Sequence, residues 1–202
     1  MSIFHDKQKQ LREQMAKMAI SEAAIEVVTE KGYDKLTMND VAEKAGIATG
    51  TIYNYFKSKE DLFVFVHEQM HVTISEKLQE VATKDNDPAE RIKEFFSEVF
   101  AFCEQHKMVI ILSKQLGLKD KFPVEQKMAN IAEHIQVTQK IIDDGIKQKK
   151  FRKVDSLQTA SIWFYSLVGL LELYSYLGEE SYAEGSKTMI RFFLDYILNK
   201  EE

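Results

Sequence analysis

Residues 38–57 of the chain read MNDVAEKAGIATGTIYNYFK, and this stretch decides the fold. Two short helices that cross closely need a small residue at the crossing, a tight turn between them and apolar residues facing a supporting helix. Ala42 is small enough for a second helix to approach, and Gly46 can adopt the positive φ of the turn. Ile47 and Ile52 supply apolar contacts. The stretch therefore predicts a helix-turn-helix.

The second helix of this pair is predicted over residues 49–56, and its outward side chains suit a DNA groove. Thr49 and Thr51 can donate or accept hydrogen bonds and offer methyl groups to thymine, while Gly50 lets the backbone approach the bases. Five further residues can reach phosphate oxygens: Tyr53, Asn54, Tyr55, Lys57 and Lys59. The exposed amides near Thr37 can do the same from the first helix of the pair. We expect the phosphate contacts to position the protein and the threonines to specify the sequence.

Flanking segments carry the start and stop signals of two longer helices. Apolar residues recur at helical spacing over residues 11–28, and Gly32 follows where a left-handed C-terminal cap is expected. Thr37 stands three residues before Asp40, which predicts a capping box at the start of the first short helix. The same arrangement recurs at Ser58 and predicts a helix that runs to about residue 83.

The rest of the chain also has helical periodicity and no sustained period-two alternation. Asp87 and Pro88 predict another helix start. The apolar stripes comprise Ile92, Phe95, Phe96, Val99, Phe100 and Cys103; Val124, Met128, Ile131, Ile135, Thr138 and Ile142; Ala160, Trp163, Phe164, Leu167, Leu171 and Tyr174; and Met189, Ile190, Phe193, Tyr196 and Ile197. The predicted fold is all-α, with a three-helix helix-turn-helix domain over residues 1–57 and a larger helical effector-binding and dimerisation domain over residues 58–202.

Charge counts mildly against a nucleic-acid partner. The net charge is -5, and residues 1–62 hold nine Lys and Arg against ten Asp and Glu, so DNA contacts must come from a local basic face. The alternative is that Tyr53, Tyr55 and Phe56 form only the core of a small helical bundle. The two tyrosines beside a Lys-Ser-Lys run favour the DNA interface.

Composition favours a cytoplasmic protein without a membrane span. The longest nearly apolar stretch, residues 160–171, is shorter than the roughly 20 residues that cross a bilayer. Residues 1–12 are polar and lack the apolar segment of a secretory signal. The single cysteine, Cys103, cannot form an internal disulfide, which agrees with a reducing compartment.

Residues 20–63 resemble the TetR family of bacterial regulators. The matching positions are Ala23-Ala24, Val27-Val28, Gly32-Tyr33, Leu36-Thr37, Val41-Ala42, Ala45-Gly46-Ile47, Gly50 to Phe56, and Ser58 to Leu62. The resemblance implies a connecting fourth helix and five or six more, the last two packing against a second subunit. It also implies DNA contacts at Thr37, Thr51, Tyr53, Tyr55 and Lys59. One departure is Ala48, where many members carry a serine that caps the recognition helix.

The C-terminal stripes raise two further expectations. Six aromatic residues could line an apolar effector cavity, although an aromatic stripe is more often core: Phe95, Phe96, Phe100, Trp163, Phe164 and Tyr174. The helix over residues 160–174 is apolar around most of its circumference and predicts a homodimer interface with the helix over residues 189–198. A membrane-surface helix is the alternative, but the basic polar face of such helices is missing.

One motif points to a different chemistry. His67-Glu68-Gln69-Met70-His71 matches the zinc-protease pattern, in which two histidines one turn apart bind zinc. A third ligand is not close in sequence, so ordinary helix residues are the favoured interpretation. The alternative is a metal-binding helical protein or a metal-responsive regulator. We predict that the chain is not an enzyme and that it has no cofactor. The predicted function is a repressor released from a palindromic DNA operator by a small lipophilic effector.

Overall fold

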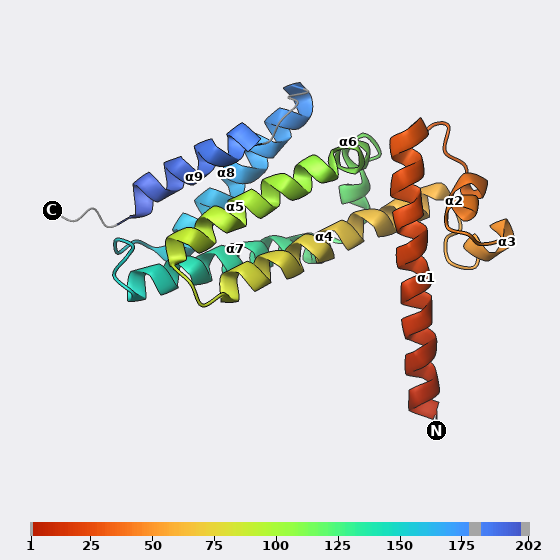
Figure 1. Ribbon diagram of the computed structural model, residues 1–202, viewed down its shortest axis with the longest axis horizontal. Coiled ribbons are helices and arrows are strands. Elements are labelled where there is room, and N and C mark those ends of the chain that lie inside the picture. The colour runs from red at the N-terminus through yellow and green to blue at the C-terminus, as the bar shows by residue number, and fades with distance from the viewer. Residues whose placement is uncertain (1, 178–182, 199–202) are drawn as a thin grey trace. The chain divides into compact units, whose positions relative to one another are not determined.

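The computed structural model describes residues 2–177 and 183–198, and side chains over residues 5–174 and 184–198. The described ranges contain nine α-helices and one 3-10 helix, and their one β-type pairing is an isolated bridge between Phe151 and Leu198 (Figure 1). The helices are α1 (Ser2–Lys31), α2 (Met38–Lys44), α3 (Thr49–Ile52), α4 (Lys59–Thr83), α5 (Pro88–Gln105), α6 (Lys107–Gln115), α7 (Val124–Lys147), α8 (Ser156–Leu177) and α9 (Ala183–Ile197), with the 3-10 helix at Leu118–Lys121. The predicted all-α fold is confirmed.

The chain forms two compact units, each with its own core. Unit 1 consists of Met1–Met70 and Met108–Lys121, and unit 2 of His71–Lys107 and Phe122–Glu202. The core of unit 1 takes its side chains from α1, α2, α3, the first turns of α4, α6 and the 3-10 helix. The segment that contains most of α6 therefore belongs to the N-terminal unit, although nearly forty residues separate it from the rest of that unit in sequence.

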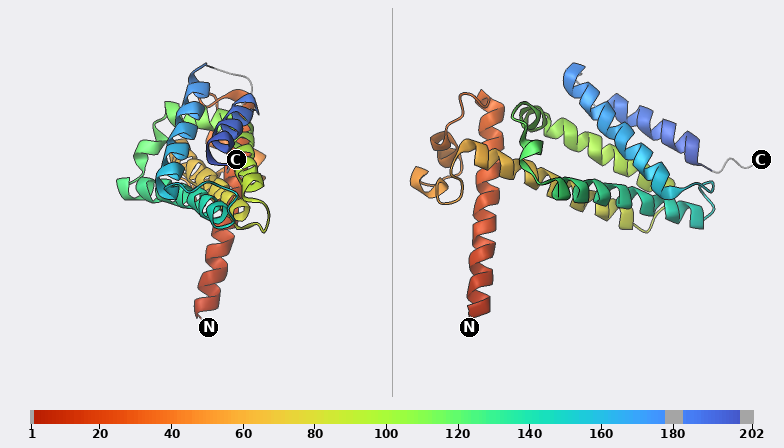
Figure 2. Two further views of the ribbon diagram at one scale, coloured as in Figure 1. Left: turned by 90° about the vertical axis from the view of Figure 1, so that its left-hand side faces the viewer. Right: turned by 180° about the vertical axis from the view of Figure 1, so that it is seen from behind.

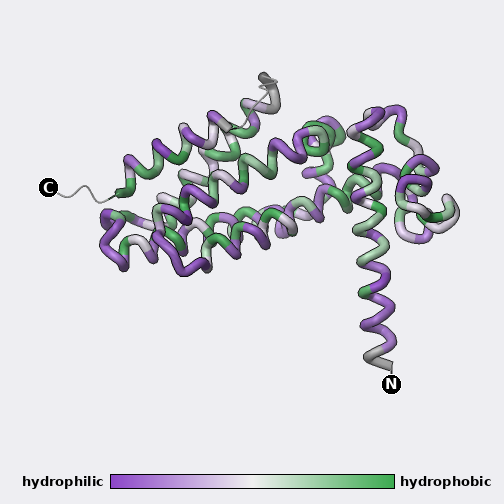
Figure 3. Tube along the Cα trace, in the orientation of Figure 1, coloured by the Kyte–Doolittle hydropathy of each residue, from purple (hydrophilic) through white to green (hydrophobic). Residues whose placement is uncertain are grey.

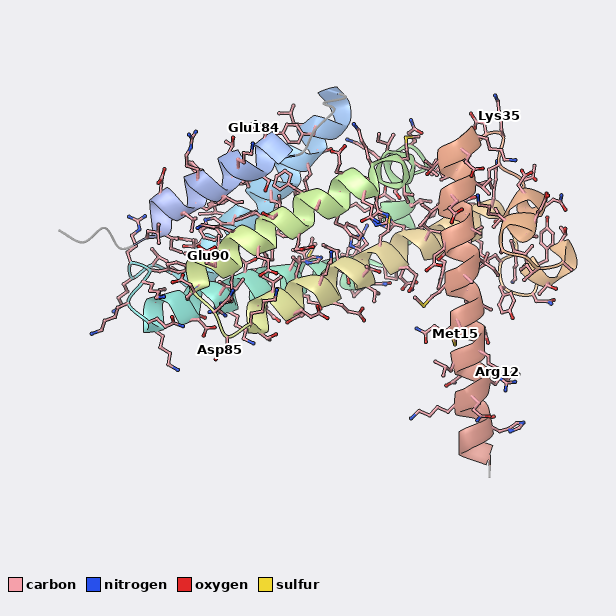
Figure 4. All side chains as sticks on the ribbon, in the orientation of Figure 1. Arg12, Met15, Lys35, Asp85, Glu90 and Glu184 are labelled. Carbon is pink, nitrogen blue, oxygen red and sulfur yellow. The ribbon has the colours of Figure 1, made fainter. Side chains whose placement is uncertain are left out.

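Helix α1 is longer than the pattern predicted, and its two halves differ. Its second half supplies core residues of unit 1: Ile20, Ala23, Ala24, Val27 and Val28. Before this buried part, Leu11, Met15 and Met18 are 59%, 63% and 43% exposed, so the apolar spacing over residues 11–28 does not mark one continuous buried face. Figure 3 shows these first turns as mostly hydrophilic, and Figure 4 labels Arg12 and Met15 on them. Helical spacing indicated the helix correctly, but nothing else in unit 1 covers this stripe.

The predicted turns and caps of unit 1 are confirmed. Gly32 (φ 77°) ends α1 and Gly46 (φ 69°) forms the turn between α2 and α3, in a region that side chains disfavour. Asp61 N–H donates to Ser58 Oγ over 3.1 Å at the start of α4. Helix α4 then ends at Thr83, as expected.

Unit 2 is a helical bundle with an aromatic centre. All six stripe residues of α5 are buried, and Asp87 Oδ1 accepts from the Ala89 N–H over 2.7 Å at its N-cap. The Phe96 ring stacks on Phe193 of α9, with centroids 5.3 Å apart. Trp163 of α8 lies 4.4 Å from the same Phe193 ring. Figure 2 shows α5, α7, α8 and α9 of this unit from two further sides.

A buried arginine ties three segments of unit 2 together. Arg91 is 3% exposed, and its Nη1 donates to Ala82 O over 2.9 Å and to Asp144 Oδ2 over 2.8 Å. It thereby joins the end of α4, the start of α5 and the end of α7. Helix α7 begins differently from its prediction, because Val124 and Met128 are 61% and 56% exposed instead of buried. No described helix is long and apolar enough to cross a membrane.

Candidate nucleic-acid interface

Helix α2 is closed at its start by its own side chains. Thr37 Oγ1 donates to Asp40 Oδ2 over 2.7 Å and accepts from the Asp40 N–H over 3.2 Å. A hydrogen bond from Lys31, followed by those from Thr37, lowers the pKa of Asp40 to about 2. Because the Thr37 hydroxyl proton is held by Asp40, this hydroxyl has no donor left for a phosphate while the cap persists.

Helix α3 is a single turn, shorter than the predicted residues 49–56. Its N-cap residue, Ala48, makes no side-chain hydrogen bond. Threonines and a glycine have low helix propensity, and without a cap they support only a short helix. The chain continues as a turn in which the Phe56 N–H still donates to Ile52 O over 3.0 Å. Residues 53–56 therefore stay close to the axis of α3 although they are not part of it.

Two buried side chains anchor α3 and the turn after it. Ile52 is fully buried and Phe56 is 2% exposed, both within the core of unit 1. Between them Tyr53 is 52% exposed. The other outward residues are Thr49, Thr51 and Tyr55, which are half-buried, and Gly50, Asn54 and Lys57, which are exposed. The structure thus brings seven of the predicted DNA-binding residues together on one short segment.

The two remaining candidates have internal roles. Thr37 closes α2, as described above. Lys59 Nζ donates to Tyr33 O over 3.0 Å and lies 4.3 Å from the centroid of the Tyr33 ring, so it ties the turn after α1 to the start of α4. Burial raises the pKa of the Tyr33 phenol. Lys57, by contrast, has no ion-pair partner among the described residues and is open to a phosphate.

One polar residue at this surface, Asn39, was not predicted from the sequence. Asn39 lies in the first turn of α2, and its Oδ1 accepts a hydrogen bond from Thr49 Oγ1 over 2.6 Å. The two residues are ten positions apart and meet across the glycine turn. The signal that could have found Asn39 is its place two residues after the N-cap Thr37, on the helix that packs against α3.

The six predicted effector residues lie in unit 2, and most of them fill its core. Phe95, Phe96, Phe100 and Trp163 are 4% or less exposed. Phe164 is half-buried, with its ring 6.0 Å from that of His134, and Tyr174 is half-buried against the backbone of Gly185. A pocket of about 480 Å³ lies instead at the ends of α4 and α7. It is lined by polar and charged residues such as Arg91 and Lys140, and by none of the six aromatic residues.

The histidine pair does not assemble a metal centre. His67 and His71 are half-buried on α4. Within the described part of the chain, no group of three or more His, Cys, Asp or Glu residues is arranged to hold an ion. Burial, and then the nearby His71, lower the pKa of His134. Burial raises the pKa of the Cys103 thiol to about 12, as expected for a core cysteine.

Helices α8 and α9 carry an uncovered apolar face. On α8, Ile162 and Tyr165 are 57% and 58% exposed, and Leu173 is 48% exposed. On α9, Phe192 is 64% and Tyr196 45% exposed. Monomeric proteins rarely leave such a concentration of large apolar side chains in water. The face is where the stripe pattern predicted an interface.

A glycine-turned pair of short helices on its own core, followed by a helical body, defines a helix-turn-helix protein. Residues 20–65 match the family "Bacterial regulatory proteins, tetR family". The "Fatty acid metabolism regulator protein" of Bacillus subtilis is 27% identical over 138 residues, which is 67% of this chain and 71% of that protein. The family match and this relative support a TetR family transcriptional regulator.

Two solved structures show the same fold. A TetR transcription regulator from Haloarcula marismortui superposes with a TM-score of 0.74 at 17% identity, over 92% of this chain and all of that one. The transcriptional regulator FadR from Bacillus subtilis, solved in complex with stearoyl-CoA, gives 0.63 at 20% identity over 87% of this chain and 96% of its own. The predicted family is confirmed.

Proposed function

We propose that this chain is a homodimeric DNA-binding repressor that an effector releases from an inverted-repeat operator. The observation that carries the proposal is the segment from Thr49 to Lys57. Ile52 and Phe56 hold it on the core, and the residues between and around them present hydroxyl, amide, phenol and ammonium groups outward. A surface of this kind can enter the major groove and contact phosphates on either side of it.

The roles of the individual side chains follow from their exposure. Tyr53, Asn54 and Lys57 are the most accessible and suit phosphate oxygens. Thr51 and Gly50 lie where the backbone comes closest to base edges. Lys59 and Tyr55 are partly enclosed, so they support the segment from behind and contribute to affinity mainly by holding it in place.

A second copy of the chain is the proposed partner of the α8–α9 face. A face that meets its own copy about a twofold axis buries its apolar side chains without another protein. A twofold dimer also presents two recognition segments, which fits an inverted repeat with half-sites about one DNA turn apart, roughly 34 Å.

The proposed effector is lipophilic, of the fatty acyl class. The name of the Bacillus subtilis relative refers to fatty acid metabolism, and the FadR structure contains stearoyl-CoA. In this chain Phe164, beside His134, and Tyr174 are the predicted aromatic residues that are not fully enclosed. An acyl chain between them would shift the population of unit 2 conformers, and DNA affinity would fall if that shift separates the recognition segments.

Selection from a random duplex library with the full chain, at near-physiological salt, tests the DNA function. We expect enrichment of an inverted repeat, and Lys57→Ala should lower the slope of log affinity against log salt by about 1 for each subunit. The matched control is Lys153→Ala in unit 2, an exposed lysine that should leave the slope unchanged. Folded protein that enriches no sequence would refute the proposal.

The effector is tested on the operator so obtained. Long-chain acyl-CoA should release the DNA and change the fluorescence of Trp163, the only tryptophan of the chain, whereas coenzyme A without the acyl chain should do neither. Phe164→Ala should weaken the effector response and leave DNA affinity unchanged. Release by coenzyme A alone would show that the acyl chain is not what is recognised.

A further inference from the structure

The two helices of the DNA-reading pair begin in different ways. Helix α2 carries a complete capping box made by Thr37 and Asp40. The N-cap residue of α3 is Ala48, whose side chain makes no hydrogen bond. A missing N-cap usually costs about 1 kcal/mol and leaves the first turn poorly held. The start of α3 needs another support, and the structure provides one from α2.

We propose that Asn39 is a positioning and specificity-determining residue of the DNA interface, because it fixes the hydroxyl of Thr49 at the start of α3. The inference rests on the proposed DNA-binding function. Its geometric basis is the 2.6 Å hydrogen bond from Thr49 Oγ1 to Asn39 Oδ1, which joins α2 to α3 across the glycine turn. Asn39 is exposed and Thr49 half-buried, so the pair lies at the surface of unit 1.

The hydrogen bond decides how Thr49 can read a base. A threonine hydroxyl has one proton, and here Asn39 accepts it. Thr49 Oγ1 can then only accept a hydrogen bond, and its methyl group is held in one rotamer. Such a group complements the N–H donors of adenine N6 or cytosine N4 and the methyl of thymine, and it cannot donate to guanine. A threonine whose hydroxyl is not held by Asn39 could both donate and accept hydrogen bonds, so it would discriminate less between the bases.

The amide group of Asn39 has a second, separate capacity. Its Oδ1 already accepts the hydrogen bond of Thr49, which fixes the orientation of the amide group. Its Nδ2 has two N–H groups with no partner among the described residues. Phosphate oxygens only accept hydrogen bonds, and we assign Nδ2 to a backbone phosphate beside the base that Thr49 contacts.

Three variants of the full chain separate these roles. Asn39→Ala removes both the acceptor for Thr49 and the phosphate donor. Asn39→Asp keeps an acceptor for Thr49 but replaces the donor with a carboxylate that repels phosphate. Thr49→Val keeps the shape of Thr49 and removes its hydroxyl. Each is compared with the parent by library selection, by affinity for single-base operator variants, and by thermal unfolding as a check on folding.

Asn39→Ala should lose about 3- to 10-fold of discrimination at one base pair of each half-site, the effect of one hydrogen bond. In the Thr49→Val background it should cause no further loss there, because the two residues act as one unit. Asn39→Asp should retain the preference at that base pair while its affinity for every sequence falls. These outcomes together would establish the positioning role.

The inference and the proposed function can fail separately. If the parent enriches no operator, the DNA-binding function itself is wrong. If the parent enriches an operator and folded Asn39→Ala keeps the same preference at every position, Asn39 does not set specificity and only the function stands. Additive losses of discrimination at that base pair in Asn39→Ala and Thr49→Val would likewise overturn the coupling, since independent contacts add.

Discussion

The two units differ in what they leave at their surface. In unit 1, polar side chains close the turns: Thr37 and Asp40 cap α2, and Ser58 caps α4. In unit 2, the α8–α9 face leaves Ile162 and Phe192 more than half exposed. The turns of unit 1 are closed by its own polar side chains, and its outward face can bind a polar ligand. Unit 2 carries an exposed apolar face of the kind that marks interaction sites in other proteins.

The comparison shows that helices of one chain can present either polar or apolar groups to the solvent. A helix end whose backbone groups are bonded by nearby side chains presents donors and acceptors in fixed positions. A helix with apolar residues on its outer face gains further stability when that face is covered. Four variants, described below from the largest expected effect to the smallest, test this difference between the two units.

Charge placed on the α8–α9 face should have the largest effect. Ile162→Glu with Phe192→Glu should weaken self-association by about 4 kcal/mol, roughly 1000-fold, because two large apolar contacts are replaced by buried carboxylates. Analytical ultracentrifugation should show a folded monomer with little operator affinity. Gln136→Glu, an exposed position on α7, is the control and should remain dimeric. A double variant that still dimerises would place the interface elsewhere.

Loss of the buried arginine should destabilise unit 2 internally. Arg91→Met removes the donor to Ala82 O and the partner of Asp144, which should lower the free energy of unfolding by about 3 kcal/mol. The change in the free energy of unfolding is measured by urea denaturation. The control, Lys93→Met, breaks an exposed pair with Glu90 and should cost no more than about 0.5 kcal/mol. Equal losses of unfolding free energy in the two variants would mean that the burial of Arg91 does not contribute to stability.

The turn of unit 1 should tolerate a side chain poorly. Gly46 has a φ of 69°, and Gly46→Ala should cost about 1 to 2 kcal/mol of unfolding free energy. Gly50 lies four residues later with open space around its Cα and an ordinary φ. Gly50→Ala should therefore leave stability unchanged within about 0.5 kcal/mol, although it can affect DNA binding. Similar losses in both would contradict the assigned turn.

The smallest expected effect is a pH dependence of the α2 cap. Lys31 and Thr37 lower the pKa of Asp40 from its ordinary 3.8 to about 2. A carboxyl whose pKa is lower in the folded state stabilises the fold above the unfolded pKa, and this contribution is lost as the pH falls from about 4 to about 2. The stability difference between the parent and Asp40→Asn should shrink over that window. A difference that stays constant would show that the carboxylate charge is not involved.

The local signals of unit 1 were predictable because each depends on neighbours in sequence. Gly32, Gly46 and the Thr37–Asp40 box act within one turn of chain, so composition and spacing reveal them. Asn39 was missed because its partner Thr49 is ten residues away and the contact depends on how two helices cross. The length of α3 was overestimated because the apolar pattern over residues 49–56 continues into the following turn, although Ala48 already indicated a missing cap.

Periodicity alone also could not tell which stripes are covered. The stripe on α5 is buried throughout, whereas Met15 on α1 and Met128 on α7 have the same spacing and remain in water. Burial depends on what the tertiary fold brings alongside, as it does where Val109 and Leu112 of α6 join the core of unit 1. The aromatic residues illustrate the same point, since four of the six predicted effector residues are buried in the core, where the rings of Phe95, Phe96 and Trp163 pack in succession.

The uncovered first half of α1 has a kinetic consequence. A helix of 30 residues is roughly 45 Å long, and every side chain from His5 to Met15 is exposed. A helical stretch that packs on no core opens far more often than one that does. Amide hydrogens there should exchange with solvent quickly while those near Val27 are protected. Brief trypsin treatment should cut first at Lys7, Lys9 or Arg12, trimming the chain to the point where its core begins.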